Sequence, residues 1–184
     1  MPDIPLEKDQ FWFRSTLFEI EVGEDKETNP LCYGRQLANW LVSALRSDGI
    51  TVEGIFPEDW GWCVMVRKTP FSLWVGCGSV CGDQQAGEQL PRGTDVVWTC
   101  IVVAEVALLK RLFRAPDTAP KVAKLFMRVK HLVTSSPGTT LVEEPLIIGC
   151  PLWVEISPSI SMQIANIAPS TPRANAKGTI YSVS

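Results

Sequence analysis

The segment VVWTCIVVAE, residues 96–105, constrains the fold more than any other part of the chain. It is nearly all apolar and rich in β-branched residues, which pack well in strands. The apolar run that contains it is interrupted by Glu105 and stays short of the roughly 18 residues that a membrane span needs. We therefore expect residues 96–105 to form a strand at the centre of a sheet, and we expect no membrane partner.

Two segments repeat apolar residues at helical spacing. Residues 31–49 follow Asn29 and Pro30, a pair suited to begin a helix, and end at Gly49. Residues 118–135 show the same pattern, so both segments are predicted helices with one apolar face. These helices and the central strand define the expected core, which consists of Leu37, Trp40, Leu41, Trp98, Ile101, Val103, Leu125 and Phe126.

The other regular segments determine the fold class. Strands are predicted at 15–23, 50–56, 60–68, 70–78 and 138–144, a short helix near 105–114, and a loop rich in glycine at 79–95. Strands and helices do not alternate along the chain, which argues against a doubly wound fold. The order predicts an α+β fold: a two-layer sandwich with a mostly antiparallel sheet and helices on one face.

The length of 184 residues suits one domain with an appendage. We divide the chain into an N-terminal arm (1–14), an α+β core domain (15–145) and a C-terminal extension (146–184) that is partly irregular. The extension has four prolines and only three charged residues. Either it adds strands to the core, or it packs on the surface or on a neighbouring molecule.

The cellular compartment is inferred from the N-terminus and the cysteines. The first ten residues lack the basic start and apolar stretch of a secretory signal, so we expect a cytoplasmic protein. The six cysteines contain no C-x2-C pair, and the only histidine, His131, is remote from them. Free thiols are expected, with no structural metal and no cofactor.

Charge is unevenly distributed along the chain. Residues 1–60 hold twelve acids and five bases (−7), residues 61–134 five acids and ten bases (+5), and residues 135–184 three acids and two bases (−1). The basic side chains of 118–135 are expected on the solvated face of that helix. The net charge of −3 argues against nucleic acid and points to other partners.

The stretch EDWGW, residues 58–62, suggests a binding edge. If strands 15–23 and 50–56 were parallel neighbours joined by the helix between them, both would end at the same edge of the sheet. Seven residues would then gather there: Glu24, Asp25, Glu27, Glu58, Asp59, Trp60 and Trp62.

Three interpretations of these residues stay open. In the first, the acids only complement the positive end of a helix, and the two tryptophans lie on one face of a strand and pack inward. In the second, the carboxylates and a tryptophan anchor form a docking edge for a partner with a basic surface. In the third, the carboxylates converge on a divalent metal.

Three stretches carry a resemblance: GEDKETNPLCYGRQLANWLVSAL, EDWGWCVMV and LWVGCG. They resemble a family of small uncharacterised bacterial proteins over about residues 15–145. The resemblance implies no activity and no catalytic residue. In that family the chain ends soon after the last helix and strand, so residues 146–184 are a departure from it.

The sequence contains no nucleophile elbow, phosphate-binding loop or dinucleotide fingerprint. We therefore expect a non-catalytic protein-interaction module with an acidic-aromatic docking edge, similar in size and acidity to immunity proteins and secretion chaperones of bacteria. Two alternatives stay open: a divalent-metal-dependent hydrolase that uses the acid cluster, and a homo-oligomeric structural domain assembled through the C-terminal extension.

Overall fold

The computed structural model describes residues 8–80, 92–106 and 116–145. The strands are β1 (Lys8–Ser15), β2 (Gly54–Glu58), β3 (Gly61–Arg67), β4 (Ser72–Val80), β5 (Val97–Glu105) and β6 (Thr139–Val142). The helices are α1 (Arg35–Ser47) and α3 (Ala119–Thr134), with short 3-10 turns η1 (Glu24–Lys26) and η2 (Gly93–Asp95).

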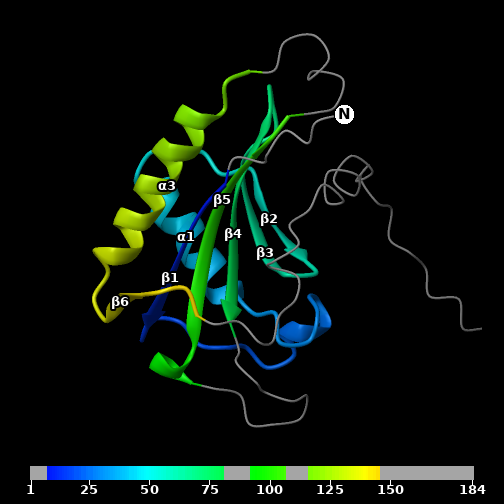
Figure 1. Cartoon of the computed structure of the whole chain (residues 1–184). Coiled ribbons are helices and arrows are strands. Elements are labelled where there is room, and N and C mark those ends of the chain that lie inside the picture. The colour runs from blue at the N-terminus through cyan, green and yellow to red at the C-terminus, as the bar shows by residue number, and fades with distance from the viewer. Residues whose placement is uncertain (1–7, 81–91, 107–115, 146–184) are drawn as a thin grey trace, which may run out of the picture.

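The six strands form one sheet in the order β2-β3-β4-β5-β1-β6. Every neighbouring pair is antiparallel. Both described α-helices lie on the same side of the sheet (Figure 1). The predicted α+β fold is therefore confirmed. The central position of residues 96–105 is confirmed as well, because β5 lies between β4 and β1 and is buried along its whole length.

The main core lies between the sheet and the two helices. Helix α1 contributes Leu37, Leu41 and Leu45 to it, each 0% exposed. Helix α3 contributes its own apolar stripe, formed by Val122, Leu125, Val129 and Val133. Of the eight expected core residues, all are buried except Trp40 and Phe126, which are partly buried and pack against the core.

The predicted first strand at 15–23 is wrong. The strand is β1, which pairs with β5 and β6, so residues 8–14 of the expected N-terminal arm belong to the sheet. Residues 15–23 do alternate apolar and acidic side chains, but of their apolar residues only Phe18 is buried, and Val22 is 95% exposed. Alternation alone could not show that Phe18 reaches the core from a loop.

The predicted parallel pairing of the first two strands is also wrong. Strand β2 pairs only with β3, and three strands separate it from β1. Since each neighbouring pair is antiparallel, β1 and β2 still run in the same direction. Strand β2 does not stop before Pro57, which lies opposite Trp62 in the register, because an edge strand tolerates the missing N–H of proline.

Helix α1 begins later than the sequence suggested. Asn29 and Pro30 lie in the loop before it, and Gly34 is its N-cap residue. A Cβ atom on Gly34 would lie 2.5 Å from the backbone oxygen of Cys77 in β4. Glycine therefore permits the start of the helix to rest directly on the backbone of a central strand.

Two expectations fall on residues outside the described ranges. They are the short helix near 105–114, of which only Glu105, at the end of β5, and Val106, in no regular element, are described, and the C-terminal extension 146–184. Neither α1 nor α3 combines the length and the hydropathy that a membrane-crossing helix requires, and the search covered the described residues.

Candidate functional site

The stretch EDWGW is the turn of the β2–β3 hairpin. Glu58 ends β2 and lies opposite Gly61, the first residue of β3. Gly61 has φ +141°, and a Cβ atom there would lie 2.6 Å from the Cys77 oxygen, so the turn is built for glycine. The prediction that Trp60 and Trp62 share one face is wrong, because the two rings join different apolar clusters.

Trp60 packs on the side of the sheet that α1 and α3 do not cover. Its ring stacks on Trp74, with centroids 5.4 Å apart. A Cβ atom on Gly76 would lie 2.9 Å from the Trp60 ring, so the ring lies directly over that glycine. Trp60 is only 4% exposed, which makes it a packing residue and not an exposed anchor.

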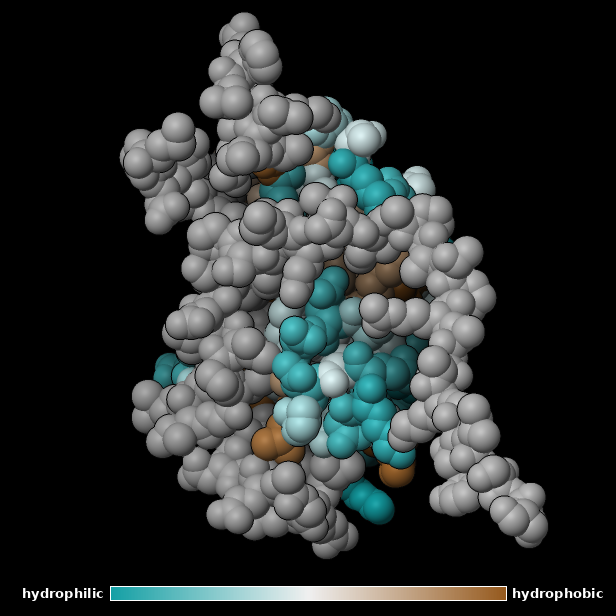
Figure 2. Space-filling view, turned by 90° about the vertical axis from the view of Figure 1, so that its right-hand side faces the viewer, coloured by the Kyte–Doolittle hydropathy of each residue, from teal (hydrophilic) through white to brown (hydrophobic). Residues whose placement is uncertain are grey.

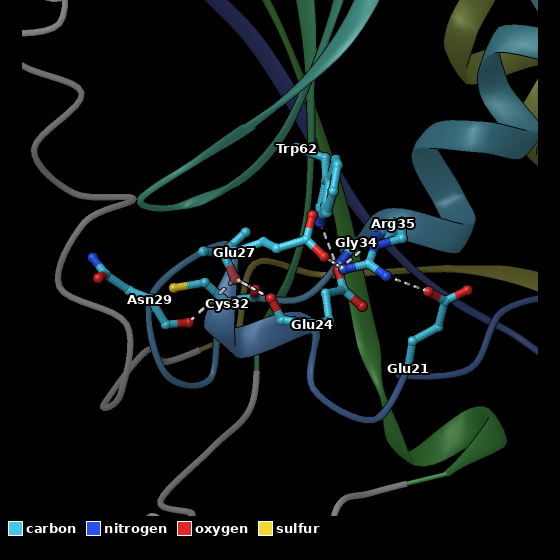
Figure 3. A network of polar contacts seen from close by, with 9 residues as sticks. Glu21, Glu24, Glu27, Asn29, Cys32, Gly34, Arg35 and Trp62 are labelled. Carbon is cyan, nitrogen blue, oxygen red and sulfur yellow. Dashed lines mark hydrogen bonds and ion pairs between the residues drawn. The ribbon is translucent and has the colours of Figure 1, made fainter. Parts of the chain in front are cut away.

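Trp62 lies on the helix side, where it meets a buried carboxylate (Figure 3). Glu24 is 0% exposed, and its Oε1 atom accepts three N–H groups. They come from the backbone of Gly34 at 2.6 Å, the backbone of Arg35 at 2.7 Å and Nε1 of Trp62 at 2.7 Å. The first two N–H groups lie at the start of α1, where they have no acceptor within the helix. Glu24 therefore caps the helix and complements its positive end.

Arg35 connects two further acids of the same loop to this network. Its guanidinium forms ion pairs with Glu21, at 3.1 Å, and with Glu27. It also lies over the Trp62 ring, 4.9 Å from the centroid. The two acids are therefore held in place by a residue of α1 that also packs on β3 (Figure 3).

These contacts fix a long connection between β1 and α1, residues 16–34, which we call the acidic loop. Connections of more than about 12–15 residues without regular structure are uncommon in compact domains. This one is attached to the rest of the domain through Phe18 in the core and through Glu24, and within the loop the Thr28 hydroxyl donates to the Cys32 oxygen at 2.6 Å. Val22 points to solvent from it, and the sequence analysis did not single out that residue.

The predicted acidic edge is therefore divided between two roles. Glu24, Trp60 and Trp62 are buried and structural. Glu27 and Asp59 are exposed, while Asp25 and Glu58 are half-buried. The Glu24–Trp62 bond joins η1 to the start of β3, and the hairpin turn lies beside η1 (Figures 1 and 3). The acids of the loop and of the turn thus lie at the same end of the sheet.

Glu58 is the acid of this group whose protonation the fold changes. Partial burial raises the pKa of its carboxyl, and the neighbouring charge of Asp59 raises that pKa further. A raised pKa in the folded state means that ionised Glu58 destabilises the fold above that pKa. Below the ordinary pKa of 4.5 the carboxyl is protonated in both states, and this effect is absent.

We therefore expect Glu58→Gln to raise the melting temperature at pH 7. The gain should shrink as the pH falls through the folded pKa and vanish below about pH 4, where wild-type Glu58 is neutral in both states. Thermal melts of both proteins from pH 3 to pH 8 test this. A melting temperature that the substitution lowers at pH 7 would show that ionised Glu58 stabilises the turn.

The cysteines offer no reactive thiol among the described residues. Cys63, Cys77 and Cys100 are free thiols, and all three are buried, as is Cys32. Burial raises the pKa of Cys63 far above its usual range, and burial together with a hydrogen bond to Cys100 does the same for Cys77. Cys81 and Cys150 lie outside the described residues. Within 8–80, 92–106 and 116–145, no three side chains of His, Cys, Asp or Glu gather in a way that could hold a metal ion.

The surface seen from the side of η1 and the β2–β3 hairpin is mainly hydrophilic where it shows described residues, with only small hydrophobic areas (Figure 2). No protein-family model, curated protein or solved structure matches this chain. The resemblance to small bacterial proteins therefore stays an expectation.

Proposed function

We propose that this chain is a non-catalytic protein-interaction module that binds a partner with a basic surface. The binding surface would be the acidic rim, which we define as Glu21, Asp25, Glu27, Glu58 and Asp59. The observation that carries the proposal is the fixed acidic loop: buried Glu24 holds it from inside, while the neighbouring acids are half-buried or exposed.

A loop that is already fixed is suited to recognition. Binding a partner costs conformational entropy for every segment that must become ordered, and preorganisation removes that cost. The acidic loop is joined to α1 through Glu24 and Arg35 and to β3 through Trp62. Glu21 and Glu27 therefore keep their positions before any partner arrives, and the net negative charge of the loop would attract a basic partner from a distance.

The buried members of the predicted edge act as support in this proposal. Trp62 and Glu24 hold the loop against the sheet, and Trp60 holds the hairpin turn against β4. The most exposed apolar side chain of the acidic loop is Val22, at 95%, which follows Glu21 in the sequence and could supply an apolar contact. Val22 thus takes the anchoring role that the sequence analysis gave to a tryptophan.

The metal-dependent hydrolase is supported less well by this geometry. Of the predicted carboxylates, the most enclosed one, Glu24, already accepts three N–H groups through its Oε1 atom. Assembly of a homo-oligomer through the C-terminal extension concerns residues outside the described ranges. It stays an alternative that the oligomeric state of the purified protein would test.

The proposal predicts that neutralising the hairpin acids weakens partner capture without unfolding the protein. The test variant is the double change Glu58→Gln with Asp59→Asn. The matched control is Glu143→Gln with Glu144→Gln, which removes two exposed acids that follow β6. Proteins cross-linked to each purified variant in a lysate of the source cells would be identified, and the strongest binder purified and titrated at two salt concentrations.

A true partner should be basic, bind wild type and control alike, and bind the test variant more weakly. Its affinity for wild type should fall as salt is raised, because salt screens exposed charges. Equal affinity of the partner for both double variants would reject the acidic rim as its binding site. Unfolding of the test variant, detected by circular dichroism, would show that these acids are structural instead.

A further inference from the structure

The side of the sheet opposite α1 and α3, here called the far face, is as apolar as the main core. Its central side chains come from three strands and from the hairpin turn, and each is at most 4% exposed. They are Trp60, Cys63, Met65, Trp74, Ile101 and Val103, which form one cluster with Cys32 and with the partly buried Phe56.

A two-layer sandwich does not explain this face. An antiparallel sheet with helices on one side usually carries polar residues on the other, so its strands alternate. At the centre of strand β5, the side chains on both faces are apolar. Ile101 and Val103 belong to the far-face cluster, while Cys100 and Val102 belong to the main core. The far face therefore needs a third layer, because without one it would expose a larger contiguous apolar surface than a monomer usually does.

The far face also needs hydrogen-bond acceptors. Among the residues that the structure describes, the indole N–H groups of Trp12 and Trp74 are buried and have no hydrogen-bond partner. Trp12 alternates along β1 with the core residues Phe11 and Phe13, so it points to the far face. A buried donor without an acceptor is destabilising, and a covering segment with free carbonyl or hydroxyl oxygens would avoid that loss.

We propose that residues 146–168 of the same chain, here called the cover segment, form this third layer. The described chain leaves β6 at Val142, which lies opposite Trp12 in the register. The cover segment thus begins a few residues beyond the edge of the far face. From β1 to β3 there are three strand spacings, about 15 Å, which about five extended residues can cross.

The composition of the cover segment fits an apolar surface. Its sequence, LIIGCPLWVEISPSISMQIANIA, contains one charged residue, Glu155, among fourteen apolar ones. Exposed to water, such a segment would promote aggregation, so it requires a surface on which to bury its side chains. Its serines, its asparagine and any unpaired backbone carbonyl groups can accept hydrogen bonds from the two indoles. Residues 169–184 are more polar and are not needed for this layer.

Photo-cross-linking in the full-length protein tests the proposal. Trp153 would be replaced by the photo-reactive residue p-benzoylphenylalanine, and in a control protein Tyr181 would carry it instead. After irradiation, the first protein should give a monomer-sized product in which residue 153 is joined to peptides of β3, β4 or β5. Attachment of residue 153 to α3, to the acidic loop or to no site would overturn the proposal, as would equal attachment of residue 181 to those strands.

A product found only at the size of a dimer would assign the far face to a second copy of the chain and would overturn the intramolecular arrangement. A second measurement needs no cross-link. Val154→Asp with Ile156→Asp should release the cover segment and raise the fluorescence of an added apolar dye, whereas Ala174→Asp with Ala176→Asp should not. Equal dye fluorescence in the two variants would contradict the proposal.

Discussion

Replacing Glu24 with alanine is expected to lower the free energy of unfolding by about 3–5 kcal/mol. The change removes a buried carboxylate and leaves the N–H groups that donate to it without an acceptor. The N–H groups of Gly34, Arg35 and Trp62 would all lose the same oxygen atom. None of these donors can turn to another acceptor without moving the start of α1 or the Trp62 ring. Chemical denaturation at pH 7 measures the loss.

Two further variants show which part of Glu24 matters. Glu24→Gln keeps an oxygen for the three donors and removes only the charge, so it should cost clearly less than alanine. Glu27→Ala removes an exposed acid of the same loop that pairs with Arg35, and its cost should stay below about 1 kcal/mol. A loss for Glu24→Ala no larger than that for Glu27→Ala would mean that the three hydrogen bonds do not hold the loop.

The sequence was sufficient for those parts of the fold that depend on local pattern. Residues 96–105 have to be buried on both faces because they hold almost no polar side chain, and β5 is a central strand for that reason. The apolar stripes of the two helices indicated which face of each helix meets the sheet. The final strand at 138–144 was also correct in position, as β6 shows.

The first strand was misplaced because the alternation of residues 15–23 has another cause. Glu21 pairs with Arg35, and the side chain of Glu19 accepts the N–H of Gly93 at 3.2 Å. Phe18 meets Trp98 in the core from the loop, with ring centroids 5.9 Å apart. These contacts join residues far apart in the sequence, so a local pattern could not distinguish a loop held at several points from a strand.

The candidate site was predicted in composition but not in the roles of its residues. Nothing local distinguishes Glu24 from its acidic neighbours, and only the tertiary structure places it among three N–H donors. The two tryptophans separate because Gly61, at φ +141°, begins β3 after the turn, so Trp60 is not part of that strand. Gly61, between two tryptophans, was the one available signal for this reversal.

Replacing Leu37 with alanine is expected to cost about 2–5 kcal/mol, the range for truncating a buried leucine. Leu37 is 0% exposed and lies on the face of α1 that packs in the main core. It follows Gly34 by one turn, and the Gly34 backbone rests on Cys77 of β4. Because the helix is fixed there, it cannot easily shift to fill the space that the leucine leaves, which favours the upper half of the range.

The matched control is Asn39→Ala on the exposed side of the same helix, where alanine removes no core contact. Its effect on the free energy of unfolding should stay within about 0.5 kcal/mol. Equal effects of the two substitutions would mean that this face of α1 does not pack on the sheet. A large loss in the free energy of unfolding for Leu37→Ala alone would confirm that this face of α1 packs on the sheet. The start of the same helix presents the Gly34 and Arg35 N–H groups to Glu24, so the packing of α1 also supports the position of the acidic loop.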